Sequence, residues 1–273
     1  MKLAISNLAW ETVQDQQISD LLQAHGVSAI DVAPGKYFQN IAHTNAREVE
    51  AVRRWWNDRG IEIIGMQALL YGTSGLNVFG DADVQQKLLS HLDAVCRVGK
   101  TLGATRLVFG SPRNRDRSSL SEEITRAVAT SFFHRLGDIA AGHGVNICLE
   151  PNPSCYGANF MTNSLETAAV VRSVAHPAIQ MQFDTGSLTI NGEDANQTLQ
   201  QCAKLVGHIH LSEPNLLPLG DTDTNHAAIA ETLIRHLPSH VATIEMLATV
   251  GEAHEISITR ALRTALRYYS GRT

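Results

Sequence analysis

The chain has 273 residues, of which 44% are hydrophobic and 18% are charged, and its formal net charge is −5. This composition is typical of a globular protein with a large core, and the acidic balance argues against a nucleic-acid partner, whose binding needs clustered Lys and Arg. No stretch approaches the roughly 18 apolar residues of a membrane-spanning helix, and the first strand is too short and polar for a signal peptide, so we expect a cytoplasmic protein without a membrane partner.

Short apolar segments alternate with longer amphipathic segments along the whole chain. The expected strands cover residues 3–9, 29–33, 62–69, 106–109, 146–150, 179–184, 207–211 and 241–246. The expected helices cover residues 15–25, 45–58, 81–102, 120–141, 164–173, 196–205, 225–237 and 253–269. Eight strand–helix pairs in a chain of this length predict an α/β protein with a single domain, residues 1–273, folded as a (β/α)8 TIM barrel.

An open, doubly wound sheet is the alternative fold for such an alternation. That fold usually carries a glycine-rich phosphate-binding turn after its first strand. Here the first strand is followed by Trp10-Glu11-Thr12, which contains no glycine. The sequence therefore favours the closed barrel.

Metal-binding side chains end four successive strands of the predicted barrel. Glu150, Asp184 and Glu245 end the fifth, sixth and eighth strands, and His210 lies near the end of the seventh. In a TIM barrel the carboxyl ends of the strands form the active-site face. Three carboxylates that converge there repel one another and are costly to desolvate, and a divalent cation removes both costs. The pattern predicts one metal ion bound by these four residues.

Each ligand taken alone has a simpler explanation, because a single acidic residue at a strand end is more often a helix cap or part of a loop ion pair. The recurrence on four consecutive strands is what indicates a shared site. His208 lies two residues before His210, on the same side of the strand. We expect it one layer deeper, as a satisfied core histidine or a support for the ligands. The oxygen-rich ligand set favours Mn²⁺, with Mg²⁺ or Co²⁺ as substitutes.

The segments around these ligands resemble the xylose isomerase-like TIM-barrel superfamily, which includes ketose 3-epimerases, hydroxypyruvate isomerase, inosose dehydratase and endonuclease IV. The similar segments are Cys-Leu-Glu150-Pro-Asn152, Gln-Phe-Asp184-Thr-Gly, Gly-His-Ile-His210-Leu-Ser-Glu213 and Ile-Glu245. The resemblance covers the whole chain. It implies a sugar or sugar-phosphate isomerase or epimerase in which Glu150 and Glu245 form the catalytic acid–base pair. Such an enzyme abstracts a proton next to a carbonyl through a metal-held enediolate.

Two positions depart from the ketose 3-epimerases. Those enzymes carry a His three residues after the Asp ligand and an Arg six residues after the His ligand, and both groups hold or polarise substrate oxygens. This chain has Ser187 and Leu216 at these positions. The departures argue against 3-epimerisation of a free ketose and in favour of another sugar or polyol substrate.

Six polar residues near the ends of the predicted strands are candidate substrate contacts. They are Asn7, Gln67, Asn152, Glu213, Lys36 and Arg113. The amides and Glu213 can hydrogen-bond either sugar hydroxyls or their own loops, and the two cations can bind an anionic group or stay solvated. Arg113 forms a basic cluster with Arg115 and Arg117, for which a solvated loop is the simpler explanation.

Other functions stay open beside the isomerase. An inosose-type dehydratase on the same metal site begins with the same proton abstraction and then eliminates water. A barrel that has lost catalysis would bind only a ligand. An endonuclease IV-like phosphodiesterase is disfavoured, because it needs several metals, many His ligands and a basic face. The outer helices could form a homodimer face, since dimers are the commonest assembly.

Overall fold

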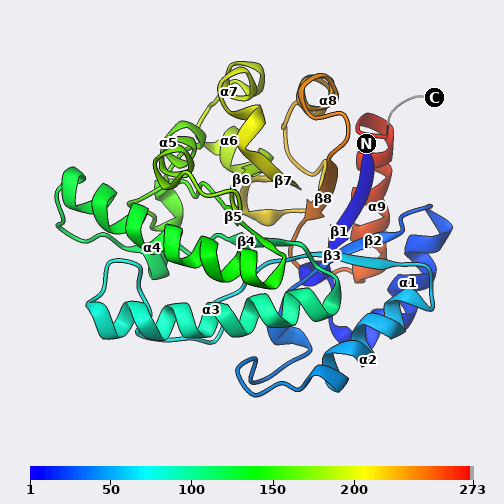
Figure 1. The fold of residues 1–273 in the computed structure, drawn as a ribbon. Helices are drawn as coiled ribbons and strands as arrows, with labels where there is room; N and C mark the ends of the chain where they lie inside the picture. Colours follow the sequence, from blue (N-terminus) through cyan, green and yellow to red (C-terminus); the bar gives the residue numbers. More distant parts are fainter. Residues whose placement is uncertain (271–273) are drawn as a thin grey trace.

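A closed ring of parallel strands forms the centre of the protein (Figure 1). The computed structural model describes residues 1–270. The strands pair in chain order, and β1 pairs with β8 to close the ring. The strands are β1 (Lys2–Ser6), β2 (Ala29–Val32), β3 (Glu62–Met66), β4 (Arg106–Phe109), β5 (Asn146–Leu149), β6 (Ile179–Asp184), β7 (Val206–Ser212) and β8 (Val241–Glu245). The predicted (β/α)8 barrel is confirmed.

Helices follow the strands and surround the ring, as Figure 1 shows. They are α1 (Asp15–Ala24), α2 (Ala46–Asn57), α3 (Ala82–Leu102), α4 (Glu122–His143), α5 (Ser164–Val174), α6 (Thr185–Ile190), α7 (Ala195–Cys202), α8 (His226–His236) and α9 (His254–Tyr268). Local capping sets many of their ends: Asp81 and Ser121 cap α3 and α4, which end at Gly103 and Gly144 in the left-handed conformation. Within residues 1–270, none of these helices has the length and apolar character needed to cross a membrane.

Two strands, β1 and β3, end three residues earlier than the sequence predicts, and the local backbone explains both differences. Ser6 accepts a hydrogen bond from the amide of Leu8 through its Oγ at 3.2 Å, which starts a short 3-10 helix, η1 (Asn7–Ala9), where we expected strand. Ala68 adopts a left-handed φ of 52° directly after Gln67 and turns the chain away from β3. Both turns lie at the end of the barrel where the candidate site was predicted.

Helix α6 was not predicted, because its segment is short and has no apolar periodicity. It begins directly after β6, and its first turn is held by Asp184, whose Oδ1 accepts a hydrogen bond from the amide of Ser187 at 2.6 Å. The predicted metal ligand is therefore also a helix cap, which was the simpler explanation for an acidic residue at this place.

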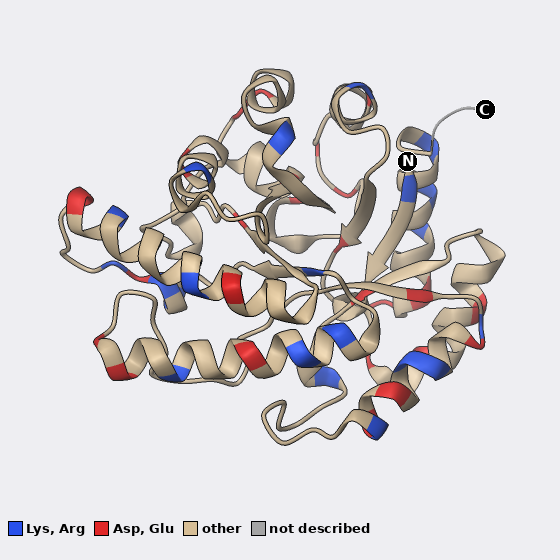
Figure 2. Ribbon diagram, in the orientation of Figure 1, with Lys and Arg blue, Asp and Glu red and all other residues tan. Residues whose placement is uncertain are grey.

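The register of the last strands aims the predicted ligands at the same region. Asp184 pairs with His210 across β6 and β7, and Ser212 pairs with Glu245 across β7 and β8. Paired residues of parallel strands point to the same face of a sheet. The charged residues of the outer helices, by contrast, are mixed in sign along the surface (Figure 2).

Candidate metal centre

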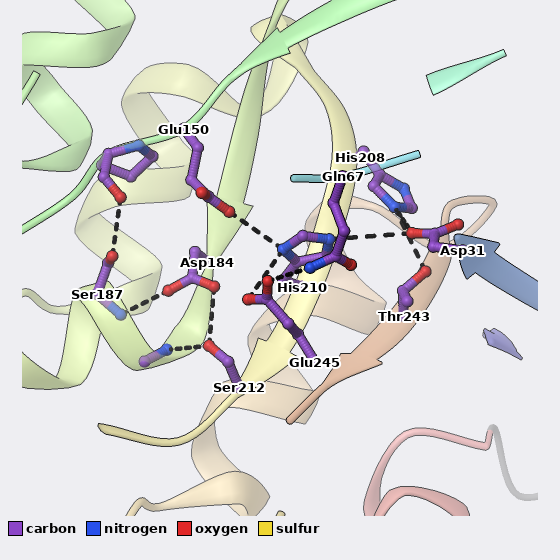
Figure 3. A network of polar contacts seen from close by, with 12 residues as sticks. Asp31, Gln67, Glu150, Asp184, Ser187, His208, His210, Ser212, Thr243 and Glu245 are labelled. Carbon is purple, nitrogen blue, oxygen red and sulfur yellow. Dashed lines mark hydrogen bonds and ion pairs between the residues drawn. The ribbon is translucent and has the colours of Figure 1, made fainter. Parts of the chain in front are cut away.

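Four side chains at, near or directly after the ends of four successive strands converge at the carboxyl end of the barrel (Figure 3). They are the predicted ligands Glu150, Asp184, His210 and Glu245, and each offers a ligand atom within 4.8 Å of those of the others. His210 lies between the glutamates: its Nδ1 is 3.1 Å from Glu150 Oε1 and 3.2 Å from Glu245 Oε2. The geometry therefore brings together all four residues that the sequence assigned to one ion.

Asp184 is the carboxylate most tightly fixed by its surroundings. Besides its Oδ1 contact with Ser187, its Oδ2 accepts a hydrogen bond from Ser212 Oγ at 2.8 Å. Burial and the nearby negative charges of Glu150 and Glu245 raise the pKa of Asp184 to about 7. The side chain is thus held in place in a position where a negative charge is poorly tolerated without a cation.

His210 responds to the same charges in the opposite direction. Burial by itself lowers the pKa of His210, but Glu245 and Glu150 outweigh it and raise the pKa well above its ordinary value. A positive charge is therefore stabilised at the point where the carboxylates meet.

The residues present fit a divalent metal ion on chemical grounds. Three carboxylates and one imidazole form a hard, oxygen-rich donor set of the kind that suits Mn²⁺, Mg²⁺ or Co²⁺. A cation at this point would neutralise the repulsion that raises the pKa of Asp184. Glu150, Asp184, His210 and Glu245 are the residues that would hold it.

Glu150 follows β5 and is positioned by three neighbours. The end of β4 makes room for it, because a Cβ added at Gly110 would lie 2.0 Å from Glu150 Oε2. Asn152 Nδ2 lies 3.4 Å from the same oxygen. Arg115 donates from Nη1 to the main-chain carbonyl of Glu150 at 2.7 Å. The strand end is thus fixed from both the main chain and the side chain.

Two cavities have the glutamates in their walls. The larger, of about 260 Å³, has mostly apolar walls that include Leu8, Leu70 and Phe109. The smaller, of about 120 Å³, includes Asp184 and Tyr156. Glu150 and Glu245 line both. A small molecule in either cavity would therefore lie against both carboxylates.

Four of the six predicted substrate contacts line these cavities, and three of them have side chains that would face a bound molecule. Gln67 and Arg113 line the larger one, and Asn152 lines the smaller one. Gln67 donates a hydrogen bond from Nε2 to Glu245, while its Oε1 is buried without a partner. Arg113 is exposed and donates to the carbonyl of Thr73 at 3.1 Å. These side chains are within reach of a bound molecule.

The other three predicted contacts are engaged by the fold itself. Asn7 is buried and accepts a hydrogen bond from the amide of Ala33 at 2.7 Å. Lys36 donates to the carbonyl of Trp10 at 2.5 Å. Neither Asn7 nor Lys36 lines the two cavities. Asn7 is thus held by the segment after β2, and Lys36 by the loop after β1 rather than by solvent.

Glu213 lines the smaller cavity, but its carboxylate faces the loop before α8 rather than a free space. Its Oε1 accepts from the amide of Gly220 at 2.7 Å and lies 2.8 Å from His226 Nε2, and its Oε2 accepts from the hydroxyls of Thr222 and Thr224. These partners occupy both oxygens. The structure favours a role of Glu213 in holding this loop, which was the other role that the sequence left open for it.

The two departures from the 3-epimerase pattern both lie at the smaller cavity. Ser187 uses its hydroxyl inside the protein, because Oγ donates to the carbonyl of Pro151 at 2.9 Å. Leu216 presents an apolar side chain and has a left-handed φ of 53°. Neither residue offers a molecule in this cavity the imidazole or guanidinium group that the 3-epimerases carry at these positions.

Sequence reasoning missed two buried charged residues next to the ligands. Arg115 is fully buried, although a solvated loop was the simpler expectation for its cluster, and burial lowers its pKa to about 10. Asp31 on β2 is also fully buried and lies 2.6 Å from His208. One signal for Asp31 was available, namely a single charged residue inside an otherwise apolar strand, Ala-Ile-Asp-Val.

The closed barrel and its cluster of carboxylates around one imidazole define a TIM-barrel protein with a metal-capable site at the strand ends. The family model of the xylose isomerase-like TIM barrel matches residues 19–267, and this chain belongs to that family. No curated protein matches the sequence.

Three solved structures illustrate the shared fold. D-psicose 3-epimerase in the presence of D-fructose has a TM-score of 0.82 at 17% identity, over 99% of this chain and 100% of that one. 3-Keto-D-glucoside 4-epimerase, YcjR, from E. coli has a TM-score of 0.78 at 16% identity, over 97% of this chain and 99% of that one. The IOLI protein with a binding zinc atom has a TM-score of 0.77 at 17% identity, over 99% of this chain and 98% of that one.

Proposed function

We propose that this protein is a divalent-metal-dependent isomerase or epimerase of a sugar, a sugar phosphate or a sugar-like polyol. The observation that carries the proposal is the pair Glu150 and Glu245, whose oxygens lie 3.1 and 3.2 Å from the same His210 nitrogen and which line both cavities. Membership of the xylose isomerase-like family and the fold shared with sugar epimerases support a sugar substrate. Mn²⁺ is the ion we expect, with Mg²⁺ or Co²⁺ as substitutes.

The reaction is a proton transfer between carbons or between faces of one carbon. A divalent cation, when bound, polarises a carbonyl and a neighbouring hydroxyl and so acidifies the adjacent C–H. One of Glu150 and Glu245 removes that proton, and the other returns a proton. Return to the same carbon from the opposite face gives an epimer, and return to the neighbouring carbon gives an aldose–ketose isomerisation.

The neighbouring side chains position this pair and the substrate. Gln67 donates a hydrogen bond to Glu245, and Asn152 lies beside Glu150, so each glutamate has its own amide partner. The free Oε1 of Gln67 is an acceptor for a substrate hydroxyl. Arg113, at the edge of the larger cavity, is placed to bind a hydroxyl or an anionic group of the substrate.

Solvent-proton exchange tests the proposal directly. The protein is incubated in D2O with ketoses, sugar phosphates and inososes, with Mn²⁺ or with a chelator, and deuterium uptake is followed by NMR. We expect exchange at one carbon of one class of compound, only with metal. Glu150→Gln and Glu245→Gln should each slow it by about 100-fold or more, the usual contribution of an acid–base group. Glu62→Gln, an exposed glutamate near the other end of the barrel, is the matched control and should leave the rate unchanged.

The products separate the alternatives. An isomer or epimer supports the proposal. A new enone or diketone absorption would instead identify a dehydratase on the same site. Tight metal binding without exchange on any compound would contradict catalysis of this kind and favour a ligand-binding barrel.

A further inference from the structure

A second buried polar group lies next to the candidate metal centre inside the barrel (Figure 3). It consists of Asp31 on β2, His208 on β7 and Thr243 on β8, all fully buried. Asp31 Oδ2 lies 2.6 Å from His208 Nε2, and Thr243 Oγ1 lies 3.3 Å from that nitrogen. The group is therefore internally hydrogen-bonded and shielded from solvent.

His210 joins this group to the metal centre. Its Nδ1 faces Glu150 and Glu245, whereas its Nε2 lies 3.9 Å from Asp31 Oδ2. Nε2 has no hydrogen-bond partner, and among the described residues Asp31 supplies the carboxylate within 4.0 Å of it. One imidazole thus lies between the acidic ligands on one side and a single carboxylate on the other.

Metal binding fixes where the His210 proton must be. A nitrogen that binds a metal offers its lone pair, so with Nδ1 as the ligand the ring proton is on Nε2. Ligating histidines usually donate this second N–H to a carboxylate, a main-chain carbonyl or water, which sets the tautomer and the orientation of the ring. Asp31 is the carboxylate on the Nε2 side of His210, at 3.9 Å, where its charge favours the tautomer with the proton on Nε2.

The barrel leaves space for the Asp31 side chain beside β3. Gly65 on β3 is paired with Asp31, and a Cβ at this glycine would lie 2.4 Å from Asp31 Oδ1. That oxygen is buried without a partner. Apolar residues of similar volume often replace buried ionic groups with no loss of stability. A carboxylate kept here, with room left for it by a glycine, points to a role toward His210.

We propose that Asp31 is a positioning residue for the metal ligand His210, an inference that rests on the proposed metal centre. The negative charge of Asp31 lies 3.9 Å from Nε2 and attracts the Nε2–H side of the ring, which keeps Nδ1 turned toward Glu150, Asp184 and Glu245. His208 and Thr243 hold Asp31 in turn.

Metal affinity and ligand geometry test this role without reference to any substrate. The probe is Co²⁺, titrated into the chelator-treated protein, with affinity from calorimetry and geometry from the visible absorption of the bound ion. Asp31→Asn keeps the shape of the side chain and removes its charge. Gly65→Ala keeps the charge and displaces Asp31. Each should weaken Co²⁺ binding by about 10- to 100-fold, the usual effect of losing the partner of a ligating histidine, and change the absorption band.

Asp15→Asn is the matched control. Asp15 is another buried aspartate, which accepts hydrogen bonds from Trp10 and Tyr37 at 2.8 and 2.9 Å, away from the ligands. This variant should bind Co²⁺ like the parent. Near-ultraviolet circular dichroism of the metal-free proteins checks that each variant is folded, and either folded Asp31 or Gly65 variant is sufficient for the comparison.

Three results would overturn the inference, and they differ from one another. Parental affinity and absorption in the folded variants would show that Asp31 does not position His210. Two Co²⁺ ions per chain in the parent and one in Asp31→Asn would make Asp31 a ligand of its own metal rather than a positioning residue. A parent that binds no Co²⁺ would remove the metal centre and with it the proposed function.

Discussion

Two buried carboxylates near the strand ends, Glu213 and Asp184, show how differently the fold can treat the same chemical group. Glu213 is surrounded by donors: burial raises its pKa, but contacts with His226, Thr222, Thr224 and the amide of Gly220 outweigh this and lower it to about 2. Asp184 has hydrogen-bond donors too, yet the adjacent glutamates leave its pKa raised. The donors of the protein itself stabilise the negative charge of Glu213. The negative charge of Asp184 is not compensated in this way, and a bound cation would stabilise it.

The lowered pKa of Glu213 predicts how stability depends on pH. The folded pKa is about 2 and the ordinary value is 4.5, so the ionised group contributes fully above about pH 4.5. This contribution is lost as the pH falls from 4.5 toward 2, and at about 1.4 kcal/mol per pKa unit it amounts to at most about 3.5 kcal/mol. Glu213→Gln should therefore lower the free energy of unfolding at pH 7 and show a shallower loss below pH 4.5.

Denaturant unfolding at pH 7 and pH 3 measures this difference. Glu231→Gln, which removes an exposed partner of Arg235, serves as control and should stay within about 0.5 kcal/mol of the parent at both pH values. Equal losses for the parent and Glu213→Gln between pH 7 and pH 3 would contradict the role given to Glu213.

At the scale of the elements, the end of β4 decides whether Glu150 can point into the site. Gly110 follows this strand, and any side chain there would meet the Glu150 carboxylate, since an added Cβ lies 2.0 Å from Oε2. Gly110→Ala should displace Glu150 and weaken Mn²⁺ binding by about tenfold or more, while the barrel remains folded.

Calorimetric Mn²⁺ titration of Gly110→Ala tests this prediction beside a second glycine variant. Gly142 in α4 has nothing within 4 Å of an added Cβ. Gly142→Ala should leave Mn²⁺ affinity unchanged and raise stability by up to about 1 kcal/mol, as expected for alanine in a helix. Unchanged Mn²⁺ affinity in Gly110→Ala would mean that Glu150 reaches the ion in another side-chain conformation, or that it is not a ligand.

At the scale of the whole molecule, the candidate ligands join four strands of the ring, so metal binding should stabilise the entire barrel. When the ion binds only the folded state, a free ion concentration of about 100 times the Kd adds about 2.7 kcal/mol to the free energy of unfolding. For a chain of this size we expect Tm to rise by about 5 °C. Differential scanning calorimetry with Mn²⁺ or with a chelator measures the shift.

Asp184→Asn supplies the control for this experiment, because it removes one ligand charge and should abolish most of the shift. A parent protein with the same Tm in Mn²⁺ and in chelator would argue against the metal centre. The predicted homodimer can be measured on the same samples by size-exclusion chromatography with light scattering, and both it and the cytoplasmic location stay predictions.

Much of the fold could be read from the sequence because barrel strands and helices leave local signals. The apolar segments that end in Glu150 and Asp184 predicted β5 and β6 to within one residue, since both faces of a barrel strand are buried. The strand ends after Ser6 and Met66 and the short helix α6 could not be predicted, because they depend on single capping contacts and on a left-handed residue, Ala68.

For the site, the sequence by itself determined the four candidate ligands, because successive parallel strands end at one face and their last residues must meet there. Tertiary structure alone decided which neighbours act with them. Glu213 is engaged by its own loop and Lys36 by the loop after β1, while Arg115 and Asp31 are buried beside Glu150 and His208. The physical reason is that the partners of a side chain often come from strands and loops distant in the chain. A local sequence pattern does not indicate which distant residues will lie close to it.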